Sequence, residues 1–220
     1  SQSALAFSEL FSKAGFPEGV FNLVIGGKAV GEKLVSGEVD VVSFTGSRLA
    51  GIEVERASAG RLRKLILELG GNNPIIVFSD SDIEGLMIHA VNSAFSNSGQ
   101  RCAAGSRILI QNNLEDRFLT AFRARCENMQ VGTSSESDVG PLISVEAAFA
   151  FEEYLVQCEQ SGARVERMGV KGSSWSSCSV LPALIHNLQP EMSLSQKEIF
   201  GPAVRVYGFK DENDAITLAN

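Results

Sequence analysis

The sequence predicts an α/β fold of the layered, doubly wound class. Short apolar segments typical of strands alternate with segments of helical periodicity along the first 70 residues, and a second series follows the double glycine Gly70-Gly71. Strands separated by single helices pair in parallel through crossover connections, which favours this class. At 220 residues, of which 44% are hydrophobic and 20% charged, the chain can bury one large or two small cores.

In the first series, a helical apolar stripe predicts a helix over 3–14, which Gly15 and Pro17 close. The segments that follow predict a strand at 20–25, a helix at 29–36, a strand at 39–44, a helix at 48–59 and a strand at 65–69. We expect residues 1–70 to form half of a nucleotide-binding type of fold.

The second series, 71–220, predicts strands at 74–78, 107–110, 180–185 and 203–209, and helices at 83–95, 115–128, 145–161 and from 212 onward. The Gly- and Ser-rich stretch 169–179 is expected to be a loop. The sequence contains no internal repeat.

Composition excludes several classes of function. A formal net charge of −7 argues against a nucleic-acid binder, because phosphate contacts need clustered Lys and Arg. No apolar run approaches the roughly 18 residues that span a bilayer, and the N-terminus lacks a secretory pattern, so a cytoplasmic protein without membrane contact is expected. The four cysteines form no CxxC pair and lie near no histidine, which predicts reduced thiols and no metal site.

Residues 44–47, Phe-Thr-Gly-Ser, end an expected strand and open an expected helix. Gly46 would let the backbone approach a ligand, Ser47 suits a helix N-cap, and the free N–H groups of a helix start favour a phosphate. An ordinary capped helix after an ordinary strand explains the same residues.

Glu68 and Cys102 are the candidates for chemistry. Glu68 ends an apolar strand between Leu67 and Leu69, either as a solvent-facing residue or as a base that lines a cleft. Cys102 lies on an expected loop among small residues, where backbone amides can stabilise an oxyanion and Arg101 could favour the thiolate. An inert cysteine is the alternative.

Four segments resemble, in their order, the signature motifs of the aldehyde dehydrogenase superfamily. They are FTGS at 44–47, LELGG at 67–71, GQRC at 99–102 and EIFGP at 198–202. The flanking text GFPEGVFNLV and NNPIIVFSDSDIE is also similar, so the resemblance extends over essentially the whole chain. It implies the C-terminal half of a Rossmann-like dinucleotide-binding domain over 1–70 and a C-terminally incomplete catalytic domain of the aldehyde dehydrogenase type over 71–220.

The resemblance implies that the Cys102 thiolate attacks an aldehyde carbonyl, with its own backbone N–H in the oxyanion hole. It implies hydride transfer to NAD or NADP, followed by hydrolysis of a thioester by water that Glu68 activates. The segment 46–51 would border the cofactor pyrophosphate, and Glu198 would hold the nicotinamide ribose. The cofactor residues implied in this way are Phe44, Gly46, Ser47, Arg48, Leu49, Ala50, Gly51, Leu69, Glu198 and Phe200.

The carboxylate at Glu68 indicates the non-acylating branch, because relatives that deliver the thioester to CoA generally lack it. GGNNP at 70–74 is similar to the succinylglutamate- and aminoadipate-semialdehyde branches, whereas CAAGSR at 102–107 resembles general aldehyde or succinate-semialdehyde enzymes. The expected substrate is therefore a small aldehyde or semialdehyde, and the full-length parent is expected to be a homo-oligomer, a dimer or a tetramer.

The resemblance also implies that the chain is a fragment, because the family's oxyanion asparagine, its ribose-binding lysine and two opening strands lie upstream of the segment that Ser1 to Gly15 resembles. Two alternatives to the complete dehydrogenase reaction follow. One is a catalytically incomplete module for folding or interaction. The other is a cofactor-independent thiol esterase that uses Cys102 and Glu68.

Overall fold

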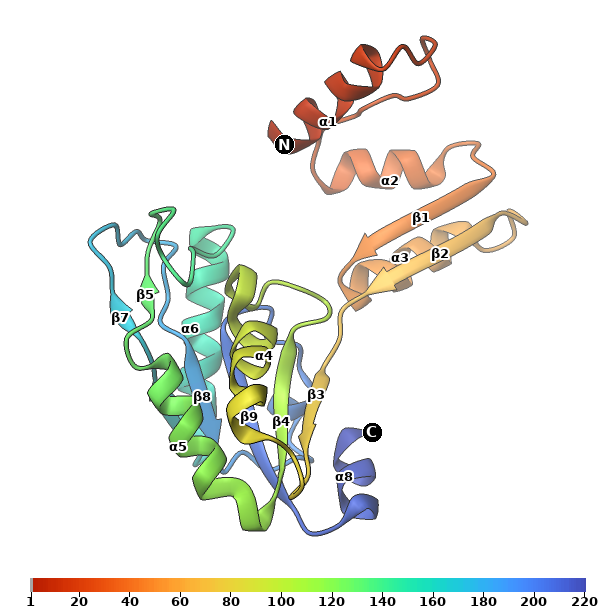
Figure 1. Ribbon diagram of the computed structural model, residues 1–220. Helices are drawn as coiled ribbons and strands as arrows, with labels where there is room; N and C mark the ends of the chain where they lie inside the picture. Colours follow the sequence, from red (N-terminus) through yellow and green to blue (C-terminus); the bar gives the residue numbers. More distant parts are fainter. Residues whose placement is uncertain (1) are drawn as a thin grey trace. The chain divides into compact units, whose positions relative to one another are not determined.

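The computed structural model describes residues 2–220 (Figure 1) and divides the chain into two compact units, one that ends at Leu69 and one that runs from Gly70 to Asn220. Helices alternate with strands in both units, and nearly all neighbouring strands pair in parallel. The α/β class predicted from the sequence is therefore confirmed.

The first unit is a short parallel β-α-β arrangement preceded by two helices. Its elements are α1 (Gln2–Lys13), α2 (Lys28–Ser36), β1 (Val41–Gly46), α3 (Arg48–Ser58) and β2 (Lys64–Leu69). The two strands pair in parallel, and α3 packs against both of them. Burial alternates residue by residue along β2, because only one face of this small sheet lies under the helix.

Four phenylalanines organise the segment around α1. The rings of Phe11 and Phe21 stack with centroids 4.1 Å apart, while Phe7 and Phe16 meet Phe11 edge-on at 5.3 and 5.0 Å. These are favourable aromatic geometries. No residue of α1 is fully buried, and the aromatic cluster gives this helix a packing contact through Phe7 and Phe11.

The predicted strand at 20–25 is wrong, since these residues have no regular secondary structure. Val20, Val24 and Ile25 are exposed. A strand is stabilised by its ladder of hydrogen bonds, and within residues 2–220 the sheet of the first unit contains only β1 and β2. The apolar pattern alone does not hold the segment in a ladder.

The second unit is built on a five-stranded sheet of order β3-β4-β9-β8-β6. Its strands are β3 (Asn73–Val77), β4 (Gly105–Gln111), β9 (Ala203–Phe209), β8 (Ala183–His186) and β6 (Arg164–Arg167). The neighbours are parallel except for β6, which runs antiparallel to β8 at the edge. The central strands β4 and β9 are buried on both faces, as expected for strands covered on both sides.

Helices cover both faces of this sheet. On one face α4 (Ile83–Phe95) and α5 (Glu115–Cys126) share a core with Ile108 and Ile110 of β4. On the other face α6 (Val145–Gln160) packs against Ile185, and α8 (Glu212–Ala219) packs against Leu109 and Phe209. The remaining elements are η1 (Ser96–Gly99), η2 (Asn112–Leu114), α7 (Ser193–Gln196) and the two-residue strands β5 (Gln130–Val131) and β7 (Val170–Lys171).

The sequence predicted most elements of this unit and missed the short polar ones. The strand β6, Arg-Val-Glu-Arg, was not expected, because its charged residues suit an exposed edge. The stretch 169–179 is mainly a loop, but it contains β7, which pairs with β5. The strand expected at 180–185 begins only at Ala183.

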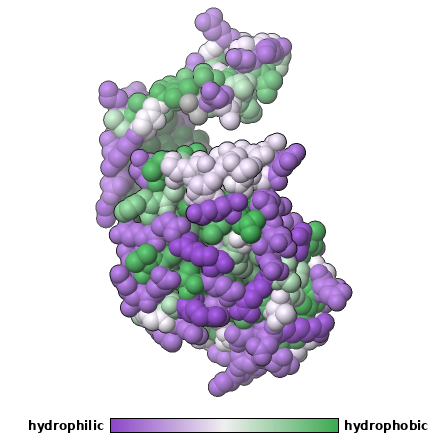
Figure 2. All heavy atoms as spheres, turned by 90° about the vertical axis from the view of Figure 1, so that its left-hand side faces the viewer, coloured by the Kyte–Doolittle hydropathy of each residue, from purple (hydrophilic) through white to green (hydrophobic). Residues whose placement is uncertain are grey.

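No helix among residues 2–220 is both long and apolar enough to cross a membrane. On the side of the second unit shown in Figure 2, hydrophobic side chains form small separate groups among hydrophilic ones.

Candidate functional site

In the first unit, the turn between β1 and α3 has the predicted form of a capped helix start. Ser47 is the N-cap with extended backbone angles (φ −68°, ψ 152°), and its hydroxyl accepts a hydrogen bond from the Ala50 N–H at 3.3 Å. The first intrahelical bond runs from the Gly51 N–H to the Ser47 carbonyl. The amides of Arg48 and Leu49 precede it at the exposed helix start.

The glycines of this turn are required by packing within the unit. A Cβ at Gly46 would come within 2.6 Å of the Phe44 ring, and one at buried Gly51 would come within 2.6 Å of a Leu69 methyl group. The fold thus brings Phe44, Gly46, Gly51 and Leu69 together in one small region. The contact that excludes a side chain at position 46 is with the Phe44 ring, not with a ligand. A ligand phosphate is compatible with the open helix N-terminus beside them.

Glu68 is exposed on β2, opposite Thr45 of β1 in the parallel register. The flanking leucines Leu67 and Leu69 are partly buried on the other face. The alternation agrees with a residue that points away from α3. Its role as a base stays a prediction.

In the second unit, Cys102 is exposed on a turn that follows a run of left-handed backbone. Asn97, Ser98 and Gly99 have φ of 53°, 57° and 68°, which costs energy at the two non-glycine positions. Tertiary hydrogen bonds hold this run, because the Ser98 hydroxyl donates to the Gly140 carbonyl at 2.8 Å. The thiol predicted to be the nucleophile is therefore accessible and carried by a fixed segment.

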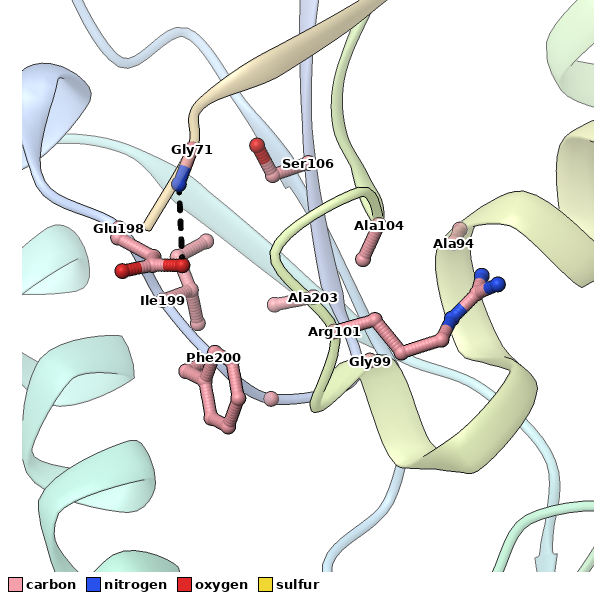
Figure 3. A pocket seen from close by; sticks show the side chains of 11 residues that line it. Gly71, Ala94, Gly99, Arg101, Ala104, Ser106, Glu198, Ile199, Phe200 and Ala203 are labelled. Carbon is pink, nitrogen blue, oxygen red and sulfur yellow. Dashed lines mark hydrogen bonds between the residues drawn. The ribbon is translucent and has the colours of Figure 1, made fainter. Parts of the chain in front are cut away.

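Arg101 anchors the same turn to the end of α4. Its Nη2 donates to the carbonyl groups of Asn92 and Ser93 at 3.1 and 2.9 Å, and its side chain points towards α4 in Figure 3. A cation at a helix C-terminus is favourable. The suggestion that its charge favours a Cys102 thiolate finds no support in these contacts.

The GQRC and EIFGP segments lie against each other. The Cβ position of Gly99 overlaps the carbonyl of Gly201, so no side chain fits there. Phe200, which precedes Gly201, has φ 44° and is half exposed. Two of the four sequence motifs thus meet through backbone atoms.

Glu198 completes this arrangement by contacting the double glycine. Its Oε1 accepts a hydrogen bond from the Gly71 N–H at 3.2 Å (Figure 3), and its carboxylate fills the position of a Cβ on Gly70. A small recess adjoins these residues. Its lining consists of Gly71, Ala94, Gly99, Arg101, Ala104, Ser106, Glu198, Ile199, Phe200, Gly201 and Ala203.

Two neighbouring asparagines that sequence reasoning did not select hold this region together. Asn73 donates from Nδ2 to the carbonyl groups of Cys102 at 2.6 Å and Ala104 at 3.1 Å. Asn72 donates to the Ser195 carbonyl at 3.1 Å and accepts from the Arg205 guanidinium at 2.5 Å. Their position directly after Gly70-Gly71, at the start of a strand, was the available signal.

Two arginines lie side by side within the sheet, Arg107 on β4 and Arg205 on β9. Arg107 donates to the carbonyl groups of Leu218 and Ala219, both at 2.7 Å, while Arg205 donates to those of Leu194 and Ser195. Burial lowers the pKa of Arg107, and the neighbouring Arg205 charge lowers it further. These cations act as carbonyl-binding anchors.

The other three cysteines differ from Cys102 in exposure. Cys126 and Cys158 are buried, whereas Cys178 is partly exposed. Burial raises the pKa of the Cys126 thiol to about 12 and also raises the pKa of Cys158. Both buried thiols are therefore poor nucleophiles at neutral pH. Within residues 2–220, no group of His, Cys, Asp and Glu side chains is arranged to hold a metal ion.

Comparison with known proteins identifies the family. The family model described as "Aldehyde dehydrogenase family" matches residues 1–220. The chain is 38% identical to a betaine aldehyde dehydrogenase of Bacillus subtilis, over 96% of this chain and 45% of that protein. It is 37% identical to an NADP(+) succinate-semialdehyde dehydrogenase of Escherichia coli, over 99% of this chain and 46% of that protein.

The fold agrees with a solved structure of a member. A betaine aldehyde dehydrogenase from Staphylococcus aureus in complex with NAD+ matches with a TM-score of 0.90 and 36% identity, over 98% of this chain and 44% of that one. The chain thus spans a little under half the length of these relatives. The match over all of its residues, with the four motifs in order, shows that the chain belongs to the aldehyde dehydrogenase family.

Proposed function

We propose that the protein containing this chain oxidises an aldehyde to a carboxylic acid with NAD or NADP, and that Cys102 is its nucleophile. The observation that carries this proposal is the exposed thiol on a fixed turn whose glycine, Gly99, packs against the segment of Glu198. Family membership supports the reaction type, and the names of relatives that use betaine aldehyde or succinate semialdehyde support an aldehyde or semialdehyde substrate.

In this proposal the Cys102 thiolate attacks the aldehyde carbon, a sulfur–carbon bond forms, and the carbonyl oxygen becomes an oxyanion. The backbone N–H of Cys102 would stabilise that oxyanion. Loss of hydride from the same carbon leaves a thioester on Cys102. Glu68 would then take a proton from water, which attacks the thioester and releases the acid and the thiol.

The residues of each unit fit parts of a dinucleotide. In the first unit, the exposed start of α3 offers the N–H groups of Arg48 and Leu49 to a phosphate. In the second unit, the carboxylate of Glu198, held by the Gly71 N–H, can accept a hydrogen bond from a ribose hydroxyl. When bound, NAD(P) supplies the hydride acceptor. We propose accordingly that residues 1–70 belong to the dinucleotide-binding domain and residues 71–220 to the catalytic domain.

A burst experiment separates the two proposed catalytic roles. With betaine aldehyde and succinate semialdehyde as separate substrates, NADH or NADPH formation is followed at 340 nm in the protein that contains this chain. Cys102→Ser should abolish formation, whereas Glu68→Gln should keep the first stoichiometric burst and slow later turnover, because Glu68 acts after hydride transfer. Cys178→Ser is the matched control and should keep both phases. Undiminished turnover in Cys102→Ser would contradict the proposal.

A further inference from the structure

Three carbonyl groups of the turn from Arg101 to Ala104 accept hydrogen bonds from the protein. The Ala104 N–H donates to the Arg101 carbonyl at 3.0 Å, and the carbonyl groups of Cys102 and Ala104 both accept from Asn73. The side-chain amide of Asn73 thus uses its two hydrogens on two carbonyl groups of one turn. Asn73 is only partly exposed, and it is fixed by its place at the start of β3.

The Cys102 carbonyl also lies close to Gly71. A Cβ at Gly71 would approach this oxygen to 2.7 Å, so the oxygen lies between the Gly71 backbone and the Asn73 amide. In a trans peptide the N–H points opposite to the C=O of the same peptide plane. The N–H of Ala103 therefore points away from Asn73, on the exposed side of the turn where Cys102 and Ala103 lie.

Two amides beside the thiol have no protein partner. Among residues 2–220, the N–H groups of Cys102 and Ala103 donate no hydrogen bond to another group of the chain. Free backbone N–H groups next to a nucleophile are the donors that stabilise an oxyanion, provided that they point to the side from which the carbonyl approaches. Rotation of the 102–103 peptide would present a carbonyl oxygen there and would repel the developing charge.

We propose that Asn73 is a positioning residue for acyl chemistry at Cys102. By holding the carbonyl groups of Cys102 and Ala104 inward, it keeps the Ala103 N–H directed outward as an oxyanion donor in addition to the amide of Cys102. The inference rests on the proposed role of Cys102 and extends it to the residue that fixes the orientation of its turn.

Two reactions of the same sulfur test the inference. Acylation by p-nitrophenyl acetate forms a sulfur–carbon bond through an oxyanion and breaks the bond to p-nitrophenolate, while the thiol proton goes to solvent. Alkylation by iodoacetamide displaces iodide and forms no oxyanion. A residue that only orients the backbone donors should affect the first reaction and spare the second.

The decisive variant is Asn73→Asp, which keeps the shape of the side chain and removes the amide donors. We expect the rate of acetylation of Cys102, measured by peptide mass spectrometry, to fall about tenfold, less than the loss of an oxyanion donor itself produces. Alkylation of Cys102 should change less than about twofold. Asn113→Asp, the same change at an exposed asparagine, should leave both rates at the wild-type value.

The buried thiols of Cys126 and Cys158 report folding in the same digest, since they react only after unfolding. If Asn73→Asp exposes these two thiols, Asn73→Ser serves as the test variant instead. Its hydroxyl can donate to one carbonyl group, so we expect an acetylation rate between those of the wild type and a variant without any donor. Wild-type acetylation in the folded variant, or an equal loss of both reactions, would overturn the role of Asn73. Absence of Cys102 acetylation in the wild type would instead refute the proposed nucleophile, and the inference with it.

Discussion

Glu198 illustrates at the scale of one residue how a proposed cofactor residue is held. Its carboxylate accepts from the Gly71 N–H and occupies the space that the missing side chain of Gly70 leaves free. The carboxylate therefore requires a glycine at position 70, whereas a Cβ at Gly71 would come within 2.7 Å of the Cys102 carbonyl oxygen. A hydrogen bond to a charged acceptor contributes about 1.5–3 kcal/mol, which makes its loss measurable.

The contact can be tested with two variants. Glu198→Leu removes the acceptor and should lower the rate of NADH formation about tenfold or more, in line with the loss of a charge-assisted hydrogen bond. Glu198→Gln keeps an oxygen acceptor without the charge, and its rate should lie between those of the wild type and Glu198→Leu. Equal rates for the two variants would show that the hydrogen bond between Glu198 and the Gly71 N–H does not contribute to the rate of NADH formation.

The sequence indicated the residues that form motifs and missed those that support them. Cys102 was selected because small residues surround it, and Ser47 because it precedes a helix. Asn73 and Arg205 resemble ordinary polar residues in sequence, since their partners are backbone carbonyl groups far along the chain. Arg101 was interpreted through its neighbour in sequence, although its guanidinium binds the end of α4.

At the scale of the element, the packing of α3 on β2 depends on a glycine. Gly51→Ala would place a methyl group 2.6 Å from a Leu69 methyl carbon, so the helix or the leucine must shift. We expect a destabilisation of about 1–2 kcal/mol, as for other overpacked sites. Chemical denaturation of the variant would measure it.

A helical glycine in the same unit provides the matched control. Gly31 lies in α2, and a Cβ there meets no atom within 4 Å. Gly31→Ala should stabilise the protein by about 0.5–1 kcal/mol, because alanine loses less backbone entropy in a helix. If both variants shifted the denaturation midpoint in the same direction, the close approach of Leu69 to Gly51 would be refuted.

Elements with a strong period were predictable, and elements defined by their partners were not. The helix expected at 83–95 begins and ends at those residues, because its buried positions recur at helical spacing. The apolar segment 20–25 is not a strand, whereas the charged residues Arg164–Arg167 form one. In both places the conformation depends on whether a neighbouring strand is available for pairing, and the local pattern of apolar and polar residues does not show this.

At the scale of the whole molecule, stability should depend on pH through a buried histidine. Burial lowers the pKa of His186, and the nearby Arg164 charge lowers it further, against the opposing effect of Glu166. In the unfolded chain His186 is protonated as the pH falls below about 6.5, whereas in the folded protein its protonation requires a lower pH. The contribution of neutral His186 to stability is therefore complete above that pH and is lost as the pH falls below it.

Glu166 acts in the same direction at lower pH. Its pKa is lowered, first by the hydrogen bond from Arg123, so its contribution is lost as the pH falls below about 4.5. We expect the Tm to drop between pH 7.5 and 5.5, and His186→Gln to reduce that drop. An unchanged drop in the variant would assign the pH dependence to other groups.

The alternation of helices and strands was predictable over most of the chain, but the order of the sheet was not. The sequence gives no sign that β9, near the end of the chain, lies between β4 and β8. That order places the segment of Glu198 beside the turn of Cys102. The meeting of these two motifs is therefore a property of the fold, and sequence alone suggested it only through family resemblance.

The most direct test of the central claim is competitive alkylation of the four thiols at pH 7 with limiting iodoacetamide, followed by peptide mass spectrometry. Exposure on a fixed turn predicts that Cys102 reacts first, that the partly exposed Cys178 reacts more slowly, and that buried Cys126 and Cys158 remain unmodified. Equal modification of all four cysteines would contradict the assignment of Cys102 as the nucleophile.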